Sequence, residues 1–317
     1  MENISQQIKS FIETLVSFGE RQGVVETSVA NWIENLLKEN KINFEIQKFE
    51  TFIPNFLKEK LIIDNEEIDC KATCFVSGEI NNNYSLVSSL ISTQPLIDHE
   101  NINFNPLCDS ISRGNHYFAP SIAIKKSDVT KVISGKDIKG IVEVEKIKHE
   151  SKNILVGNLN NPKNILVCHY DSVGPGATDN ASGTAMLLSL ILNNQEVLLN
   201  NLFIIGGNEE LSYDYPIYWG HGYRAFEEKY FDLLESVNNI FVVDCVGDGD
   251  VTFDNNISTV RLGFPLKNLE KYINKTSLVY GSFEKLMEVY QSDIDLVEVL
   301  SEEFLGQTYV DLLEKIK

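Results

Sequence analysis

The chain has 317 residues, of which 43% are hydrophobic and 23% charged, a globular composition that excludes a fibrous or disordered protein. Asp and Glu number 46 against 27 Lys and Arg, so the formal net charge is −19. A field of this sign repels phosphate backbones and anionic lipids, which argues against nucleic-acid and membrane partners. The longest apolar run, Ala185–Leu192, is far shorter than the ~20 residues of a membrane-spanning helix.

The first residues and the cysteines favour a cytoplasmic protein. The stretch after Met1 lacks the basic and apolar regions of a secretory signal. The cysteines are odd in number and scattered along the chain, which fits a reducing compartment better than a disulfide framework. Cys70 and Cys74 have the spacing of half a zinc site, but no second Cys or His pair accompanies them. We therefore interpret both as packing residues.

Residues 1–51 are expected to be mainly helical. Apolar residues recur at helical spacing between residues 8 and 18 and again between residues 29 and 37. Ile42, Phe44 and Ile46 then alternate with polar residues, which predicts a short strand. We expect the apolar faces of these helices to pack against the core of the main domain.

Residues 52–148 consist of short β-rich runs between Asn, Asp, Gly, Ser and Pro turn signals. This texture predicts a smaller β-rich domain, inserted into the main domain, without catalytic residues and with strands separate from the main sheet. His99, His116 and His149 lie in or beside it without a partnering Asp, Glu or Cys pattern, so we expect surface or structural roles for them. The runs are Leu61–Ile63, Tyr84–Ile91, Ser121–Ile124 and Gly140–Val144.

Residues 149–317 alternate apolar strands with helices. Asn153–Val156 and Asn164–Cys168 flank a turn and predict a hairpin. Strands that are apolar on both faces and alternate with helices predict a parallel sheet covered by helices. The predicted fold class is therefore α/β, a mostly parallel mixed sheet sandwiched by helices, with the inserted β-rich domain. The further elements are strands at Leu202–Ile205 and Ile240–Val243 and helices at Ala181–Leu192 and Tyr223–Leu234.

Three of these strands end in polar residues that are able to bind metal ions. Ligand sites in parallel sheets form outside the carboxyl ends of the strands, so these side chains should converge. A glycine-rich loop after the first strand, residues 174–183, is flexible enough to fold Asp179 over the same edge. The ligand-type residues are His169 and Asp171 after the first strand, Glu209 and Glu210 after the second, and Asp244 after the third.

One imidazole and several carboxylates form an oxygen-rich site suited to zinc or manganese. In metal-assisted hydrolysis, two such ions share a bridging carboxylate and hold a deprotonated water between them. Glu209 and Glu210 are adjacent and point in opposite directions, one toward metal and one toward water. Asp171 lies on the same face as His169 and is placed to hold its other N–H. Each motif alone is more often a turn or a helix cap, but three strands ending alike favour the hydrolytic site.

These residues resemble the co-catalytic zinc aminopeptidases, a family that includes bacterial leucyl aminopeptidases, glutaminyl cyclases, glutamate carboxypeptidases and the transferrin receptor ectodomain. The resemblance covers residues 151 to about 250 well. Residues 52–148 sit where some members carry a protease-associated β-domain. The matching motifs, in order, are His169-Tyr-Asp171-Ser172, Asp179-Asn-Ala-Ser-Gly183, Asn208-Glu209-Glu210 and Val243-Asp244.

The resemblance implies a metal-dependent aminopeptidase that hydrolyses N-terminal residues from peptides through a metal-activated water. It makes residues 1–51 and 149–317 the peptidase domain around the insert, and it implies a cis peptide bond between Asp179 and Asn180. The implied roles are His169 and Asp244 on one metal, Glu210 on the other, Asp179 bridging both, and Glu209 as the general base.

The C-terminal part departs from the family pattern, which has a metal-binding histidine near its carboxyl end. The last histidine here is His221, and the closest match, Gln307–Ile316, places Gln307 at the position of the family's histidine. An amide oxygen is neutral and a weaker zinc ligand than imidazole. We therefore expect one tightly bound zinc and a second that is weak or absent, with manganese or cobalt as alternatives. His221 completing the second site is the other interpretation.

Two rival functions follow from this departure. One is a catalytically impaired family member that binds peptides in its cleft without hydrolysing them. The other is a single-metal acyltransferase of the glutaminyl cyclase type, which would need the missing histidine. A peptide substrate is the one partner that the sequence predicts. The sequence does not assign the oligomeric state or the preferred N-terminal residue.

Overall fold

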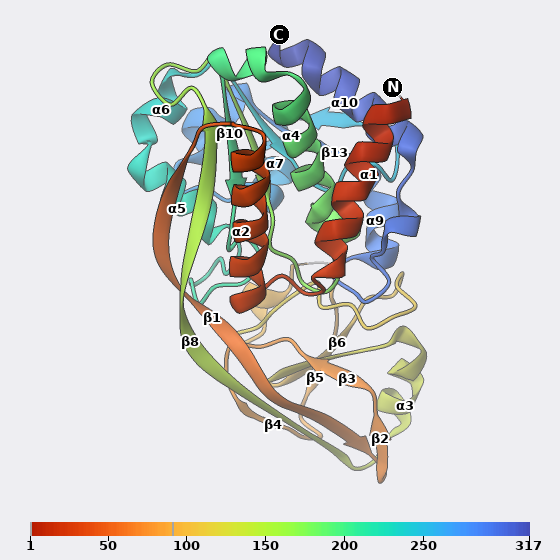
Figure 1. The fold of residues 1–317 in the computed structure, drawn as a ribbon. Helices are drawn as coiled ribbons and strands as arrows, with labels where there is room; N and C mark the ends of the chain where they lie inside the picture. Colours follow the sequence, from red (N-terminus) through yellow and green to blue (C-terminus); the bar gives the residue numbers. More distant parts are fainter. Residues whose placement is uncertain (1, 91) are drawn as a thin grey trace.

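The computed structural model describes residues 2–90 and 92–317 and shows a helical lobe built on a mixed sheet, with a smaller lobe at the far end of two long strands (Figure 1). The four central strands of the main sheet run parallel and the outer ones antiparallel, so the predicted mixed α/β fold is confirmed, with the parallel part confined to the centre. In spatial order the strands are β12 (Thr252–Asp254), β13 (Thr276–Tyr280), β11 (Asn239–Val243), β9 (Asn164–His169), β10 (Asn201–Gly206), β8 (Ile138–Gly157), β1 (Phe44–Ile63) and β2 (Glu66–Ile68), and β4 (Gly78–Ile80) pairs with β8 off this path.

The central strands are buried on both faces, as their continuous apolar runs require. β9 and β10 pair in register, with His169 opposite Gly206, so both strands end at the same level. The predicted hairpin between Asn153–Val156 and Asn164–Cys168 is wrong, because β10 lies between β8 and β9 and pairs with each of them. The turn between these two strands instead carries the chain across the end of β10.

Helices cover both faces of this sheet because successive strand residues point to opposite sides. Leu166 and Cys168 of β9 pack into one core, whereas Ile165 and Val167 pack into the other. The first core is closed by α1 (Glu2–Ser17), α2 (Val24–Glu39), α4 (Ser182–Asn193) and α10 (Glu302–Ile316). The second is closed by α5 (His221–Lys229), α6 (Phe231–Ser236), α7 (Ile257–Gly263) and α8 (Leu269–Tyr272).

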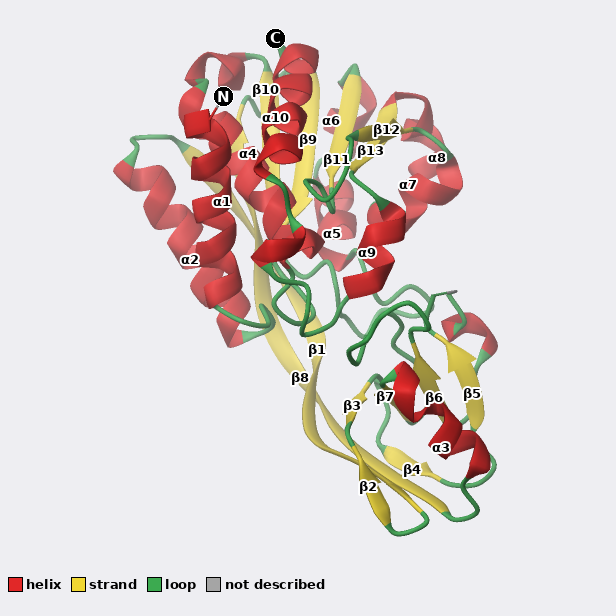
Figure 2. Cartoon of the chain, turned by 90° about the vertical axis from the view of Figure 1, so that its right-hand side faces the viewer, coloured by secondary structure: helices red, strands yellow, loops and turns green. Residues whose placement is uncertain are grey.

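β1 and β8 run without interruption from the helical lobe into the smaller lobe (Figure 2). Each has 20 residues, and they pair antiparallel along their whole length with one irregularity between Phe56 and Lys58. The predicted boundaries at 51/52 and 148/149 fall inside these strands, so the prediction that the strands of residues 52–148 are separate from the main sheet is wrong. The composition changes there because the ribbon leaves the core and becomes polar, with ion pairs such as Lys48–Glu150 and Lys58–Glu143 across the two strands.

We call residues 58–143, which form the smaller lobe, the distal lobe. It has its own core, which includes Leu61, Ile122 and Val142, packed between the far halves of β1 and β8 and a second sheet. Of the predicted runs in this lobe, Tyr84–Ile91 contains β5, and its last residue lies outside the described residues. The second sheet has the order β3 (Cys70–Ala72), β7 (Ser121–Ile124), β6 (Asn101–Phe104) and β5 (Ser85–Ser88), with α3 (Val129–Ser134) following β7 in the chain.

Several elements of the helical lobe differ from the prediction. The helix predicted over Tyr223–Leu234 is two helices, α5 and α6, which meet at Tyr230. The Tyr230 N–H ends α5 by donating to the Phe226 carbonyl, and the Tyr230 carbonyl begins α6 by accepting from the Leu233 N–H. β13 was not predicted, although it extends the parallel sheet beside β11. α9 (Phe283–Val289) follows it.

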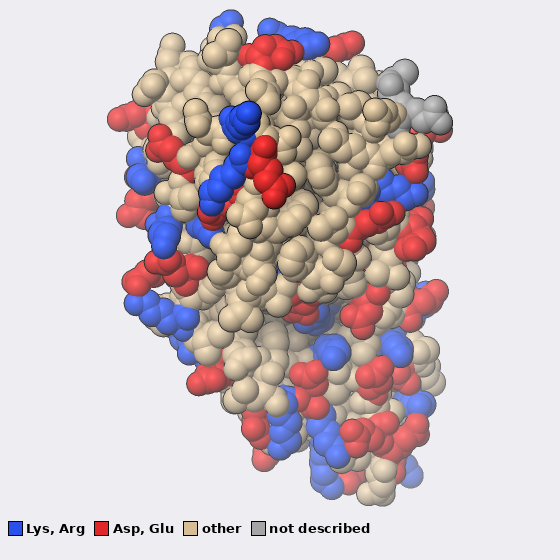
Figure 3. All heavy atoms as spheres, viewed as in Figure 1, with Lys and Arg blue, Asp and Glu red and all other residues tan. Residues whose placement is uncertain are grey.

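The surface of the molecule mixes both signs of charge. Figure 3 shows Lys and Arg side chains interspersed with Asp and Glu on one face, with both kinds crowded on the distal lobe. None of the helices within residues 2–90 and 92–317 is long and apolar enough to cross a membrane. On the face shown in Figure 3, the acidic side chains are spread among basic ones and do not form one single-sign patch.

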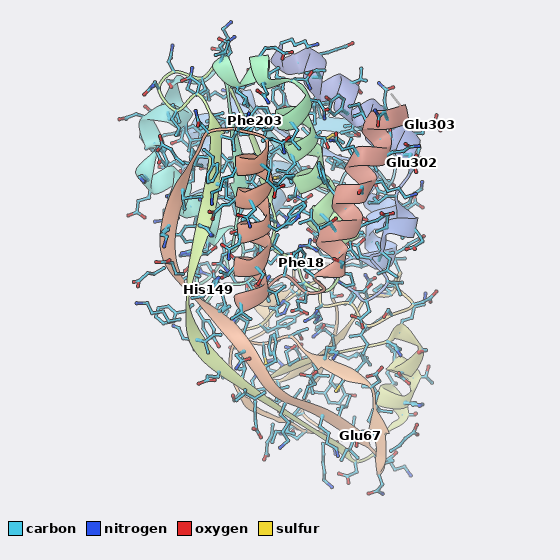
Figure 4. All side chains as sticks on the ribbon, in the orientation of Figure 1. Phe18, Glu67, His149, Phe203, Glu302 and Glu303 are labelled. Atoms are coloured by element: carbon cyan, nitrogen blue, oxygen red, sulfur yellow. The ribbon has the colours of Figure 1, made fainter. Side chains whose placement is uncertain are left out.

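The fold predicts a large stability loss when Phe203 of β10 is truncated (Figure 4). Its side chain is fully buried in the first core, so Phe203→Ala should lower the free energy of unfolding by about 3–5 kcal/mol. Leu199, just before β10, is 73% exposed, and Leu199→Ala should change the same quantity by less than about 0.5 kcal/mol. Urea unfolding followed by circular dichroism measures both, and equal losses would contradict the packing described here.

Candidate metal centre

The predicted site residues converge at the carboxyl ends of the central parallel strands, where Figure 2 shows the loops between the two lobes. His169 is the last residue of β9, and Asp244 follows β11 directly. Glu209 and Glu210 lie just beyond the end of β10. Asp179 lies in the turn Ala177–Ala181, which leads into α4. The strand order thus gathers side chains from four separate segments at one sheet edge.

Three of these residues have the spacing of a metal site. One ligand atom each from His169, Asp179 and Asp244 lies within 4.8 Å of the other two. His169 Nε2 is 3.4 Å from Asp179 Oδ1 and 3.5 Å from Asp244 Oδ1. Ligands around a tetrahedral zinc at ~2.0–2.1 Å are about 3.3 Å apart, so these three side chains fit such an ion.

Asp171 connects the histidine to the glutamate pair. The other ring nitrogen of His169, Nδ1, is 3.1 Å from the Asp171 backbone carbonyl and 3.5 Å from its carboxylate. That carboxylate is fully buried and accepts hydrogen bonds from the backbone N–H groups of Glu209 and Glu210, at 3.0 and 2.9 Å. Asp171 therefore contacts the imidazole mainly through its backbone carbonyl, while its carboxylate holds the backbone of Glu209 and Glu210 in place.

The Asp-Asn-Ala-Ser-Gly motif ties the Asp179 turn to the end of β11. Asn180 Nδ2 donates to the Val243 carbonyl at 3.0 Å, and Asn180 Oδ1 accepts from the Gly183 N–H at 2.9 Å. A Cβ on Gly183 would lie 2.4 Å from both Asn180 Oδ1 and the Val243 carbonyl oxygen, which leaves no room for a side chain. The Asp179–Asn180 peptide bond is cis, as the family resemblance implies.

Two buried charged residues, Arg21 and Asp295, hold the loops that carry these ligands, and neither was predicted from the sequence. Arg21 donates to the Tyr170 and Gly176 carbonyls at 2.7 and 3.0 Å, and burial lowers its pKa to about 10. Asp295 accepts from the backbone N–H of Asp179 at 3.1 Å, and burial raises its pKa to about 6. Neither residue has a local sequence signal, because each acts on segments more than a hundred positions away.

Part of the chain that carries this cluster is similar to a known protein family. Residues 153–290 match the model of peptidase family M28. This segment, which is less than half of the chain, is similar to an M28 peptidase domain, and it contains every residue of the strand-end cluster described above. No curated protein matches the sequence.

Solved structures share the fold of the whole chain. A zinc aminopeptidase from Bacillus subtilis aligns with 98% of this chain and 93% of its own, at 18% identity and a TM-score of 0.68. An aminopeptidase from Aneurinibacillus sp. strain AM-1 aligns with 98% and 92%, at 19% identity and a TM-score of 0.63. A glutaminyl cyclase from Porphyromonas gingivalis covers 98% of both chains, at 11% identity and a TM-score of 0.51. At these identities the likeness establishes the fold.

The carboxylates of the strand-end cluster are crowded and buried. Burial raises the pKa of Glu209, Glu210 and Asp179 above their ordinary values, and the neighbouring acids raise them further. Glu210 Oε1 accepts from the Val173 N–H at 3.3 Å, whereas no group within residues 2–90 and 92–317 donates a hydrogen bond to the Glu209 carboxylate. Such a cluster favours binding of a divalent cation, which compensates the buried negative charge.

The prediction that Gln307 takes the position of the family's histidine is wrong. Gln307 is exposed on α10 and donates to Asp311 at 2.7 Å, because the apolar stripe of this helix turns it outward. His221 does not reach the cluster either: it begins α5, and its Nδ1 lies 2.7 Å from Asp214 Oδ2. One polar residue of the C-terminal part that contacts a carboxylate of the cluster is Gln291, whose Nε2 donates to Glu210 Oε2 at 2.6 Å.

A cleft of about 340 Å³ opens beside the strand-end cluster. Asp179, Glu209, Glu210 and Asp244 line its floor, and the distal lobe contributes a wall through residues 89, 90, 92, 114 and 115. The remaining wall is mostly apolar. Its apolar and aromatic residues include Tyr218, Trp219, Leu262, Leu278, Tyr280, Phe283, Leu286 and Met287.

The geometry predicts that His169 is needed for metal retention. His169→Ala removes the only imidazole among the three clustered ligands, so the dialysed variant should keep less than a tenth of the zinc that the wild-type protein keeps. His99 is exposed in the distal lobe, and His99→Ala is the matched control that should keep the wild-type amount. Zinc content by atomic emission measures both. Equal zinc in the two variants would place the metal elsewhere.

Proposed function

We propose that this chain is a metal-dependent aminopeptidase in which His169, Asp179 and Asp244 hold a zinc ion. The observation that carries the proposal is the convergence of these three ligand atoms within 4.8 Å at the cleft floor. The M28 domain and the zinc aminopeptidase fold support it. Manganese and cobalt suit the same imidazole and carboxylate set and are alternatives.

A bound zinc ion would polarise the scissile carbonyl and lower the pKa of a water molecule. Glu209 would then take the proton from that water and deliver it to the leaving amine, since its carboxylate is buried at the cleft floor and burial raises its pKa, which makes it a stronger base. Glu210 supports the cluster as a second carboxylate beside Asp179. Asp171 positions the His169 ring and the Glu209 backbone through the hydrogen bonds given above.

The charge of the cleft supports removal of N-terminal residues. Its floor is lined by carboxylates, and a free α-ammonium group is the end of a peptide that such a floor attracts. A C-terminal carboxylate would meet repulsion from the same groups. The apolar wall gives the side chain of the first residue a surface to pack on. The five buried free cysteines support a reducing compartment, and we propose a cytoplasmic protein.

The second candidate is a peptide-binding protein without turnover. The hydrogen bond from Gln291 to Glu210 favours it, because it engages a carboxylate at the cleft floor. Hydrolysis of chromogenic amino-acid amides in the presence of zinc, cobalt or manganese distinguishes the two functions. Turnover with any of these metals supports the aminopeptidase. Peptide binding with none of them active supports the second candidate.

For the aminopeptidase we predict that Glu209→Gln lowers kcat by about 10²–10⁴-fold and leaves the zinc content unchanged. The reason is that Glu209 moves a proton and is outside the three clustered ligands. Glu303, exposed on α10, provides the matched control, and Glu303→Gln should keep full activity. A Glu209→Gln protein that loses zinc and recovers turnover in excess metal would show that the roles of the two adjacent glutamates are reversed.

A further inference from the structure

We infer that Gln291 makes the metal centre mononuclear, by holding Glu210 with a hydrogen bond in the position where a second cation would bind. The inference rests on the proposed function, since it concerns the same cluster. It identifies a residue that neither the family match, which ends at Tyr290, nor the sequence motifs contain. The residue acts on metal stoichiometry through Glu210 and does not touch the three clustered ligands.

The contact between the two side chains is short and buried. Gln291 Nε2 donates to Glu210 Oε2 at 2.6 Å, and the two residues are 7% and 4% exposed. The backbone of Gln291 has a φ of 46°, a left-handed conformation that costs free energy in a residue with a side chain. The surrounding fold maintains it, because the Gln291 carbonyl accepts a hydrogen bond from the Arg113 N–H of the distal lobe at 2.9 Å.

The remaining atom of the amide has no partner. Gln291 Oε1 is buried without a hydrogen bond, beside the cluster of carboxylates. The Nε2 amino group of the amide faces Glu210, and its carbonyl oxygen does not. The amide therefore stabilises the negative charge of this carboxylate, as a cation in the same place would. For Gln291 to ligate an ion next to Glu210, the amide would have to turn by half a rotation and lose that hydrogen bond.

Ligand counting leads to the same result. Within residues 2–90 and 92–317, the one group of three or more ligand atoms close enough for an ion is His169, Asp179 and Asp244. An ion at Glu210 would have this carboxylate, a share of Asp179 and at best a neutral amide oxygen. That set is poor for zinc, which takes four ligands and prefers imidazole, thiolate and carboxylate groups. The first position keeps its full set of three.

The test is the number of zinc equivalents that the full-length protein keeps after dialysis, measured by mass spectrometry for the wild type and for variants of two glutamines. We expect one equivalent for the wild type and a second equivalent for Gln291→His, which replaces the amide donor by an imidazole ligand beside Glu210. Gln307→His makes the same substitution on the exposed face of α10 and should stay at one equivalent.

Two results would overturn this inference. Two tightly held equivalents in the wild type would show that Gln291 does not exclude the second ion, and would leave the proposed function standing. A folded Gln291→His protein that stays at one equivalent would show that the glutamine does not decide the stoichiometry. No retained zinc in the wild type would instead remove the metal centre itself, and the proposed function with it. If Gln291→His fails to fold, Gln291→Glu, which keeps the size of the side chain and adds a carboxylate ligand, replaces it with the same expectation.

Discussion

Buried negative charge at the ends of the parallel strands is the constraint on which this structure depends. Asp171, Asp179, Glu209 and Glu210 are all nearly inaccessible to solvent, and Asp244 is half-buried beside them. Carboxylates are expensive to bury unless they are hydrogen-bonded or meet a cation. Asp171 is satisfied by backbone N–H groups, and the guanidinium of Arg21 lies close behind the loops. The proposed divalent ion would compensate the charge of the remaining acids.

The fold holds this arrangement by contacts that come from distant parts of the chain. Arg21, in the connection between α1 and α2, binds the carbonyls of the loop after β9, and Asp295 binds the turn that carries Asp179. The distal lobe reaches the same region, since the Arg113 N–H binds the Gln291 carbonyl. The long ribbon of β1 and β8 connects that lobe to the main sheet as one continuous ladder. Both lobes therefore shape one cleft.

The sequence predicted the strand-end cluster because its residues follow apolar strands directly, and parallel strands end at one edge. It did not predict Arg21, Asp295 or Gln291, whose contacts have no periodicity or local motif. The error at Gln307 arose because matching by motif ignored the helix period: Leu305, Tyr309 and Leu312 are the buried stripe of α10, and Gln307 faces outward. The domain boundaries failed for a related reason, since a change in composition marks where a strand leaves the core and not where it ends.

The most direct test of this account is to locate the metal. A crystal of the protein soaked in zinc and measured on both sides of the zinc absorption edge gives an anomalous map of every ordered zinc ion. The account predicts a strong peak in contact with His169, Asp179 and Asp244 at the carboxyl ends of β9 and β11. A soaked crystal with no peak there, or with its strongest peak away from these three side chains, would contradict it.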